Sequence, residues 1–563
     1  MADTQSGVHE ISDRYVSEFS ALHPVLATYV GVSGHDERMT DYSPEGHAAR
    51  AELNRAALAA VRAAEPSGPA EQVAKAVFEE RIGLALEIHE AGLDVASLNT
   101  MDSPISELRS VFDLMPTATP ADWEVIATRL AAMPEALDGV RASLDKAVAD
   151  GNPPALRQVD KVAEQCETWA GLRGEEPFFG RMVAGADPVE GVDDALRRTL
   201  EDTARTATKA YAEMATYLRE TLAPRATPRD AVGADVYRLC SRDFLGTELD
   251  LREAYEWGWE EFSRLEAEMK RVAARVAPGA SLAETAERLD NDPRYLVAGR
   301  DAFTRWMQDL SDRALQDLRG VHFDISDRVM RLDCRIAPQG GPVGAYYTGP
   351  NEDFSRPGSM WWSLPADRQE FTTWREVTTV YHEGAPGHHL QCAVAMEAAD
   401  SLNSFQRMFC WVSGHGEGWA LYAERLMHEL GYLEDDGNLM GMLDGQMFRA
   451  ARVIVDLGMH LELEIPAGTG FHEGERWTPD LGLEFMLTRT ITDPPHVRDE
   501  IDRYLGWPGQ APSYKLGERL WLAARDDAKA RAGDAFDLRS FHTQALRLGS
   551  MGLDTLRRQL AAL

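Results

Sequence analysis

The sequence predicts a mainly α-helical fold with one small β-sheet, and three observations favour this class. Apolar residues recur at three- and four-residue spacing among good helix formers along most of the chain. Proline and glycine separate these helical segments from one another. Residues 321–348 instead alternate apolar and polar side chains, as a half-buried strand does. We therefore expect a short sheet or hairpin at about 321–348 and helices on both sides of it.

The helical segments divide the chain into two halves. Residues 1–225 carry no chemical motif, and we expect them to form a helical N-terminal half. Residues 226–563 should form a catalytic half that holds the small sheet and the metal-binding helices. Residues 351–366, with Trp361 and Trp362, look irregular. The clearest helical patterns cover 46–64, 70–92, 121–149, 193–222, 249–276, 299–319, 371–381 and 446–462.

Charge and composition argue against several classes of protein. The formal net charge of −34 disfavours nucleic-acid binding, which needs clustered cations to displace counterions. No run approaches eighteen consecutive apolar residues, so we expect no membrane span. The N-terminus shows no basic region followed by an apolar one, and the five cysteines form no CxxC pair. We expect a cytoplasmic protein with reduced thiols, and no feature predicts its oligomeric state.

A histidine-rich motif begins at His382-Glu383. Catalytic zinc typically takes three protein ligands and leaves one position open. The usual helical solution places two histidines at i and i+4 with a glutamate at i+1 as the general base. Here position 386 is proline, and the next histidines are His388 and His389. The motif is therefore a near match with two extra residues.

The residues between the histidines predict a break in the helix. On a continuous helix His388 would lie about 120° around and about 9 Å along from His382, too far to share an ion. Gly384, Pro386 and Gly387 disfavour a continuous helix, since proline lacks a backbone donor and glycine admits unusual dihedrals. We expect about two residues to loop out and return His388 to an i+4-like position. His389 would then point away or support a ligand from behind.

A third ligand is expected about thirty residues downstream. Glu417 and Glu424 share one helical face at i,i+7 in an otherwise apolar segment, so simple solvation does not explain them. Glycines flank Glu417 and permit close approach to a metal. We assign Glu417 to the metal, with His415 as the alternative. Glu424 would hold a ligand imidazole by its other nitrogen.

Another polar row lies on the predicted helix 446–462. Arg452, Asp456 and His460 fall at i, i+4 and i+8, among apolar neighbours. The row is either an exposed ion pair or a partly buried functional face. In the second case His460 stabilises an oxyanion or binds substrate, and Asp456 fixes its tautomer.

Several segments resemble the bacterial domain-of-unknown-function 885 family. The resemblance covers nearly the whole chain, and its specific motifs lie in the C-terminal half. Many members of that family look like exported lipoproteins, but this sequence shows no such leader. The matching segments are HEGAPGHHLQ (382–391), GEGWALYAE (416–424), RVIVDLGMH (452–460), RYLGWPGQAPSYKLG (503–517), AYYTGP (345–350) and SRPG (355–358).

The family in turn resembles helical zinc peptidases of the thermostable carboxypeptidase and thimet oligopeptidase type. That resemblance implies a large multi-helix fold with a deep groove and a small sheet beside the metal helix. By position it implies His382 and His388 as metal ligands, Glu383 as the base and Glu417 as the third ligand. The inserted Gly-Ala-Pro (384–386) is the departure from the pattern.

The same resemblance implies roles for several tyrosines. A strand beside the metal helix can bind substrate backbone in such peptidases, which suggests the strand ending in Tyr346 and Tyr347. A late tyrosine donates to the oxyanion in those enzymes. Tyr514 is the candidate here, ahead of Tyr504.

Together these features predict a zinc hydrolase that cleaves an amide bond, with one Zn²⁺ or another divalent ion. A peptidase or carboxypeptidase acting on short peptides fits the resemblance best. A hydrolase of a non-peptide amide and a non-catalytic binding protein with a degenerate metal site remain open alternatives. Measuring the metal content would distinguish the non-catalytic binding protein from the two hydrolases. Identifying the substrate would distinguish the peptidase from the hydrolase of a non-peptide amide.

Overall fold

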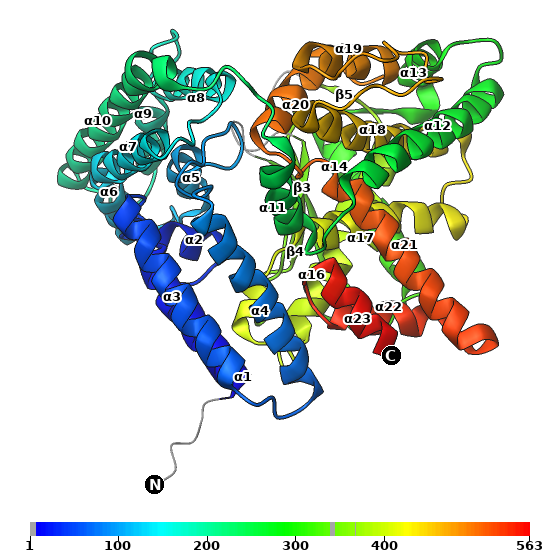
Figure 1. The fold of residues 1–563 in the computed structure, drawn as a ribbon, viewed down its shortest axis with the longest axis horizontal. Coiled ribbons are helices and arrows are strands. Elements are labelled where there is room, and N and C mark those ends of the chain that lie inside the picture. Colours follow the sequence, from blue (N-terminus) through cyan, green and yellow to red (C-terminus); the bar gives the residue numbers. More distant parts are fainter. Residues whose placement is uncertain (1–6, 338–343, 366–367, 563) are drawn as a thin grey trace. The chain divides into compact units, whose positions relative to one another are not determined.

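The structure is a computed structural model that describes residues 7–337, 344–365 and 368–562. Helices account for 66% of the residues and strands for 5%, which confirms the mainly α prediction. The chain forms two compact units (Figure 1). Unit 1 is Met1–Val232 with Asp499–Trp507, and unit 2 is Gly233–Arg498 with Pro508–Leu563. No helix in the described ranges is both long and apolar enough to cross a bilayer.

Unit 1 consists of helices that begin at strong start signals. Proline opens several of them, and Ser43 and Thr119 accept hydrogen bonds from backbone N–H groups in the first turns of α3 and α6. The predicted segment 121–149 forms two helices, with Pro134 in the first turn of the second. The helices are α1 (Val8–Leu22), α2 (Pro24–Tyr29), α3 (Pro44–Ala63), α4 (Pro69–Glu90), α5 (Pro104–Ser110), α6 (Pro120–Ala131), α7 (Met133–Ala149), α8 (Leu156–Trp169), α9 (Phe178–Val183) and α10 (Asp194–Tyr217).

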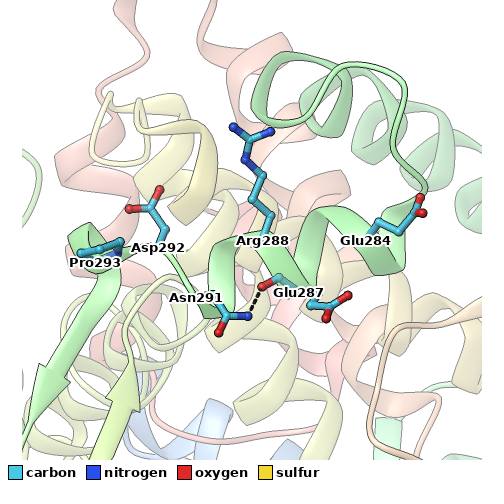
Figure 2. A pocket seen from close by; sticks show the side chains of 6 residues that line it. All are labelled: Glu284, Glu287, Arg288, Asn291, Asp292 and Pro293. Atoms are coloured by element: carbon cyan, nitrogen blue, oxygen red, sulfur yellow. Dashed lines mark hydrogen bonds between the residues drawn. The ribbon is translucent and has the colours of Figure 1, made fainter.

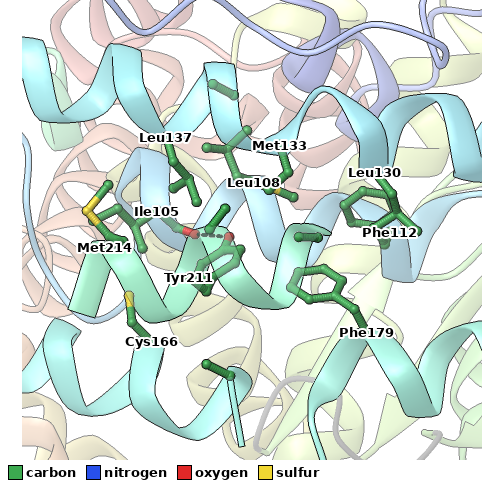
Figure 3. Packing of buried hydrophobic residues seen from close by; sticks show 14 of the residues in the cluster. Ile105, Leu108, Phe112, Leu130, Met133, Leu137, Cys166, Phe179, Tyr211 and Met214 are labelled. Carbon is green, nitrogen blue, oxygen red and sulfur yellow. Dashed lines mark hydrogen bonds between the residues drawn. The ribbon is translucent and has the colours of Figure 1, made fainter. Parts of the chain in front are cut away.

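The core of unit 1 gathers around α10 (Figure 3). Tyr211 is fully buried there and donates a 2.8 Å hydrogen bond to the carbonyl of Ile105. Helix α20 (Pro494–Gly506) ends in this unit, where the backbone carbonyl of Asp502 accepts from Gln158. The Asp502 carboxylate pairs with Lys161 at 2.8 Å. The remaining buried residues labelled in Figure 3 are Leu108, Phe112, Leu130, Met133, Leu137, Cys166, Phe179 and Met214.

Unit 2 is built on two pairs of packed helices (Figure 1). Helices α12 and α18 pack along each other, as do α17 and α21. A side chain on Gly418 of α17 would meet the backbone of Gly517 on α21, so glycine lets these helices approach closely. The helices are α11 (Gly233–Leu245), α12 (Leu251–Val276), α13 (Leu282–Asp290), α14 (Arg300–Leu318), α15 (Glu376–Glu383), α16 (His388–Glu397), α17 (Ser413–Glu429), α18 (Asp436–Leu461), α19 (Pro479–Arg489), α21 (Ser513–Ala532), α22 (Leu538–Arg547) and α23 (Leu553–Ala562).

The main sheet has three strands in the order β2-β4-β3. Strand β2 (Leu332–Ile336) runs parallel to β4 (Gly358–Trp362), and β3 (Ala345–Thr348) runs antiparallel to β4. Strands β3 and β4 contact α15 and α16, which confirms a small sheet beside these helices. Residues 338–343 of the predicted strand region lie outside the described residues.

Three details of the secondary-structure prediction were wrong. The segment 351–366 contains the central strand β4, which is almost wholly buried and therefore shows no alternation of apolar and polar residues. A second, two-stranded sheet pairs β1 (Leu296–Ala298) with β5 (Glu370–Thr372). The helix predicted over 371–381 starts later than expected, because α15 begins at Glu376 and residues 371–372 belong to β5.

Candidate metal centre

Helix α15 supplies the first two residues of the site. Val377, Val380 and Tyr381 are buried and fix the helix against its surroundings. His382 and Glu383 occupy its last turn, where both side chains are also buried. The helix ends at Glu383, directly before the glycines and proline that predict its end.

The break between α15 and α16 has the expected length. The N–H of Gly387 donates to the carbonyl of Tyr381 at 3.0 Å, a span of six residues where a continuous helix spans four. The chain therefore accommodates two extra residues before α16 begins at His388. A side chain on Gly387 would meet the carbonyl oxygen of His382, so this turn requires glycine.

The break brings His382 and His388 together with Glu417 of α17. The Oε2 atom of Glu417 lies 3.2 Å from Nε2 of His382 and 3.4 Å from Nε2 of His388. One ligand atom from each of the three residues falls within 4.8 Å of the other two. The two imidazole rings are perpendicular, with centroids 4.9 Å apart.

The two distances from Glu417 fit a bound zinc ion. Ligand atoms at 2.0–2.1 Å from a tetrahedral zinc lie about 3.3 Å from one another. Two neutral imidazoles and one carboxylate are also a donor set that catalytic zinc accepts. The residues present therefore fit the metal that the sequence motif predicts.

Glu424 contacts the Nδ1 side of the His382 imidazole. The Nδ1–H of His382 donates to Oε1 of Glu424 at 2.7 Å, and the hydroxyl of Thr378 donates to Oε2 at 2.7 Å. Burial opposes a charge on His382, but its hydrogen bonds with Glu417 and Glu424 outweigh burial and raise its pKa to about 10. In the absence of a metal, a proton on His382 thus balances the two carboxylates.

The pKa values of the two carboxylates beside His382 shift in the opposite direction from that of Glu383. Burial acts to raise the pKa of Glu417, yet the nearby His388 and His382 lower it well below its usual value. The pKa of Glu424 is also lowered, because the hydrogen bond from His382 and the charge of Arg449 outweigh burial. Burial dominates at Glu383 and raises its pKa. Glu383 is therefore the more basic carboxylate of the three.

His389 points away from the three candidate ligands. Its Nε2 lies 2.7 Å from the carbonyl oxygen of Val329, and its Nδ1 lies 3.0 Å from the hydroxyl of Tyr347 on β3. Tyr346 stacks on Trp361 of the adjacent strand, with ring centroids 6.1 Å apart. Tyr347 thus supports a neighbour of the site, whereas Tyr346 packs within the sheet.

His415 does not join the group of candidate ligands. Its Nδ1 accepts a 2.8 Å hydrogen bond from the side-chain amide of Gln391. Burial lowers its pKa to about 3, so the imidazole is neutral. The geometry favours Glu417 over His415 as the third ligand.

The polar row on α18 is buried. Arg452, Asp456 and His460 are exposed by 6% or less, so the row is not a solvated ion pair. The Oδ2 atom of Asp456 accepts from the hydroxyl of Tyr237 at 2.6 Å and from the N–H of Gly509 at 3.0 Å. His460 packs beside Tyr237, with ring centroids 5.8 Å apart. A role of His460 in catalysis stays a prediction.

Tyr514 lies at the start of α21 and faces two arginines of α18. The guanidinium of Arg452 lies 5.0 Å from the ring centroid of Tyr514, and that of Arg449 lies 6.0 Å from it. Arg449 also lowers the pKa of Glu383 and Glu424 through its charge. Arg449 therefore lies near the Tyr514 ring and also acts electrostatically on two carboxylates of the candidate site.

Two residues near the cluster were missed from the sequence. Arg449 precedes Arg452 by three residues and lies on the same helical face, a spacing that would have extended the polar row. Trp411 lies beside His388, with ring centroids 6.0 Å apart. No motif marks Trp411. Tyr504, the lesser tyrosine candidate, is buried and donates to Glu500 at 2.6 Å.

A depression of about 540 Å³ lies along α13 (Figure 2). Its lining includes none of the candidate site residues, and most of its side chains are exposed. Asn291 donates to the backbone carbonyl of Glu287 at 2.7 Å, so one lining amide already has a partner. We assign no function to this depression. The lining residues are Glu284, Glu287, Arg288, Asn291, Asp292 and Pro293.

Comparison with known proteins places this site within a family. A model described as "Bacterial protein of unknown function (DUF885)" matches residues 24–560. The chain belongs to this family. The family has no established activity, so membership confirms the resemblance to family 885 but not the further one to zinc peptidases.

Solved structures share the fold of this DUF885 protein. A candidate lipoprotein from Colwellia psychrerythraea aligns with a TM-score of 0.83 at 22% identity, over 99% of this chain and 98% of its own. A candidate lipoprotein of unknown function from Shewanella oneidensis aligns with a TM-score of 0.74 at 17% identity, over 99% of this chain and 100% of its own. At such identities the likeness concerns the fold alone. No curated protein sequence matches the chain.

Proposed function

We propose that this protein is a zinc-dependent hydrolase that cleaves amide bonds, and that its substrates are short peptides. One observation carries the proposal: Glu417 lies 3.2 Å from His382 and 3.4 Å from His388, spacings that match the ligands of a single zinc ion. Glu383 follows His382 directly and completes the set that metallopeptidases use.

Zinc held by His382, His388 and Glu417 would supply a Lewis acid for the scissile carbonyl and lower the pKa of the attacking water. Glu383 would accept the proton of that water and deliver it to the leaving amine. Its raised pKa suits this exchange, since a more basic carboxylate takes the proton more readily. Glu424 would hold the imidazole of His382 in the tautomer that directs Nε2 towards Glu417 and His388.

Tyr514 is the proposed donor to the developing oxyanion, and His460 is the second candidate. The guanidinium groups of Arg449 and Arg452 near the Tyr514 ring favour negative charge at this place. A single donor of this kind contributes about 3–4 kcal/mol to the stability of the transition state.

Metal analysis is the first test. Protein purified without chelator should contain about one zinc ion per chain, or take one up on addition of zinc. The double variant His382→Ala/His388→Ala should contain none. Wild-type protein that holds no transition metal and takes none up would refute the hydrolase.

Peptide cleavage is the second test. Zinc-loaded wild type should cleave members of a short-peptide library, and Glu383→Gln should lower kcat by about 10²–10⁴-fold while it retains zinc. Loss of zinc from Glu383→Gln would contradict its assignment as the base. A zinc-loaded protein that cleaves no peptide would shift the substrate to a non-peptide amide.

The cytoplasmic location stays a prediction. The two aligned structures belong to candidate lipoproteins, so location is worth a direct measurement. Cell fractionation with an antibody against the protein would decide it.

A further inference from the structure

Trp411 places a large exposed aromatic surface beside the metal cluster. The residue is 52% exposed, more than any other tryptophan in the described chain. Its indole lies next to the imidazole of His388, at a centroid distance of 6.0 Å and an interplanar angle of 55°. An exposed aromatic ring beside a candidate active site offers a surface on which an apolar side chain of a ligand can pack.

The backbone around Trp411 is fixed on both sides by one residue. The thiol of Cys410 donates to the carbonyl of Ser550 at 3.2 Å. The N–H of Val412 donates to the hydroxyl of Ser550, also at 3.2 Å. The indole is therefore presented from an anchored segment.

Gly416 allows the indole to lie close to α17. A side chain at this position would meet the six-membered ring of Trp411. Gly416 directly precedes Glu417, so the indole lies against the backbone of α17 next to one candidate ligand and beside the ring of another, His388. The glycine in the GEGW sequence thereby has a structural purpose, which is to admit an aromatic ring beside the metal cluster.

We propose that the Trp411 indole is a subsite for an aromatic or large apolar side chain of the substrate next to the scissile amide. The proposal rests on the proposed hydrolase function. The indole lies beside His388 and against the backbone that precedes Glu417, so a substrate bound at these candidate ligands would have a neighbouring side chain near the Trp411 ring. The enzyme therefore prefers peptides with residues such as Phe or Leu at that position.

Paired metal-binding probes test the subsite without turnover. Acetohydroxamate and phenylalanine hydroxamate share one chelating group, and only the second carries a benzyl side chain. Titration calorimetry on zinc-loaded protein should show tighter binding of the benzyl probe, by about 5- to 20-fold. Trp411→Ala should reduce this preference to about twofold or less, and Trp411→Phe should retain most of it. Zinc content and circular dichroism must match wild type in both variants.

The outcomes separate the subsite from the hydrolase. If Trp411→Ala binds zinc and keeps the full benzyl preference, the subsite is wrong and the hydrolase stands. Equal binding of the two probes by zinc-loaded wild type has the same meaning. If wild type holds no zinc, both proposals fall. In peptide assays, Trp411→Ala should raise KM for Phe-containing peptides more than for Ala-containing ones, with little change in kcat.

Discussion

The Nδ1 atom of His382 lies 2.7 Å from Oε1 of Glu424, while its Nε2 atom lies 3.2 Å from Oε2 of Glu417. Glu417 and Glu424 are seven residues apart on α17, so a single helix contacts both nitrogens of one imidazole. This arrangement fixes the orientation of the ring before any metal arrives.

Glu424→Gln should weaken zinc binding by about 10–100-fold, because the amide no longer holds His382 as a charged acceptor does. Competition with a chromogenic chelator measures the change. Glu429→Gln is the matched control, since Glu429 lies on the same helix and pairs with Arg525 at 2.8 Å. Equal affinity in wild type and Glu424→Gln would remove Glu424 from the site.

His388→Ala should abolish zinc binding, whereas His389→Ala should retain it. The two residues are adjacent, but His388 faces Glu417 and His389 faces Val329 and Tyr347. His389→Ala should still lower stability by about 1–3 kcal/mol, since a buried hydrogen bond is lost. Zinc bound by His388→Ala but not by His389→Ala would show that the turn between α15 and α16 directs His389, not His388, towards the metal.

Gly387→Ala should weaken zinc binding at least tenfold. The added methyl group meets the carbonyl of His382, so the turn must shift and move His388 relative to Glu417. Gly83→Ala is the control, since nothing lies within 4 Å of a Cβ at that helical position. This control should keep zinc affinity and raise stability slightly. Unchanged zinc affinity in Gly387→Ala would contradict the need for glycine.

Unit 1 should lose stability as pH rises from about 4.3 to 7 because of Glu107. Burial is the main cause that raises its pKa to about 7, and the nearby Asp102 adds to it, while the hydroxyl of Tyr42 and Arg50 oppose it. The unfolded chain releases this proton near pH 4.3, so the folded state binds more protons between about pH 4.3 and 7. The stability from protonated Glu107 is present below that window and lost above it.

Glu107→Gln removes this titration. Calorimetric melting should show that the variant gains stability relative to wild type between pH 5 and pH 8, by on the order of 1–3 kcal/mol. The quantity to compare is the stability difference between variant and wild type at pH 8 minus the same difference at pH 5. This subtraction removes the pH-independent effect of Gln on the hydrogen bond from Tyr42. A constant difference at both pH values would show that Glu107 does not titrate in this range.

The sequence predicted the helices well because their apolar spacing is local. The strand β4 escaped prediction because both its faces are buried, so Gly358 to Trp362 show no alternation. Strand β1 pairs with β5 some seventy residues later, and three-residue strands carry too little pattern to detect.

The grouping of the three candidate ligands was predictable because the two extra residues of the motif and the residues that interrupt the helix lie in one segment. Gly384 to Gly387 indicate the break, and Glu417 follows on the next apolar helix with a carboxylate face. Arg449 and Trp411 were not predictable in the same way. Arg449 approaches the site from α18, and Trp411 comes from a loop, so only tertiary packing brings them to His388 and Glu383.

Asp499–Trp507 belongs to unit 1, although the chain reaches it only after most of unit 2. During synthesis the N-terminal helices therefore leave the ribosome long before Asp502 is available to Lys161 and Gln158. At ordinary elongation rates this delay is on the order of tens of seconds. Unit 1 thus remains incomplete while the candidate metal ligands are translated. Its N-terminal helices cannot complete their fold until Asp499–Trp507 has been synthesised.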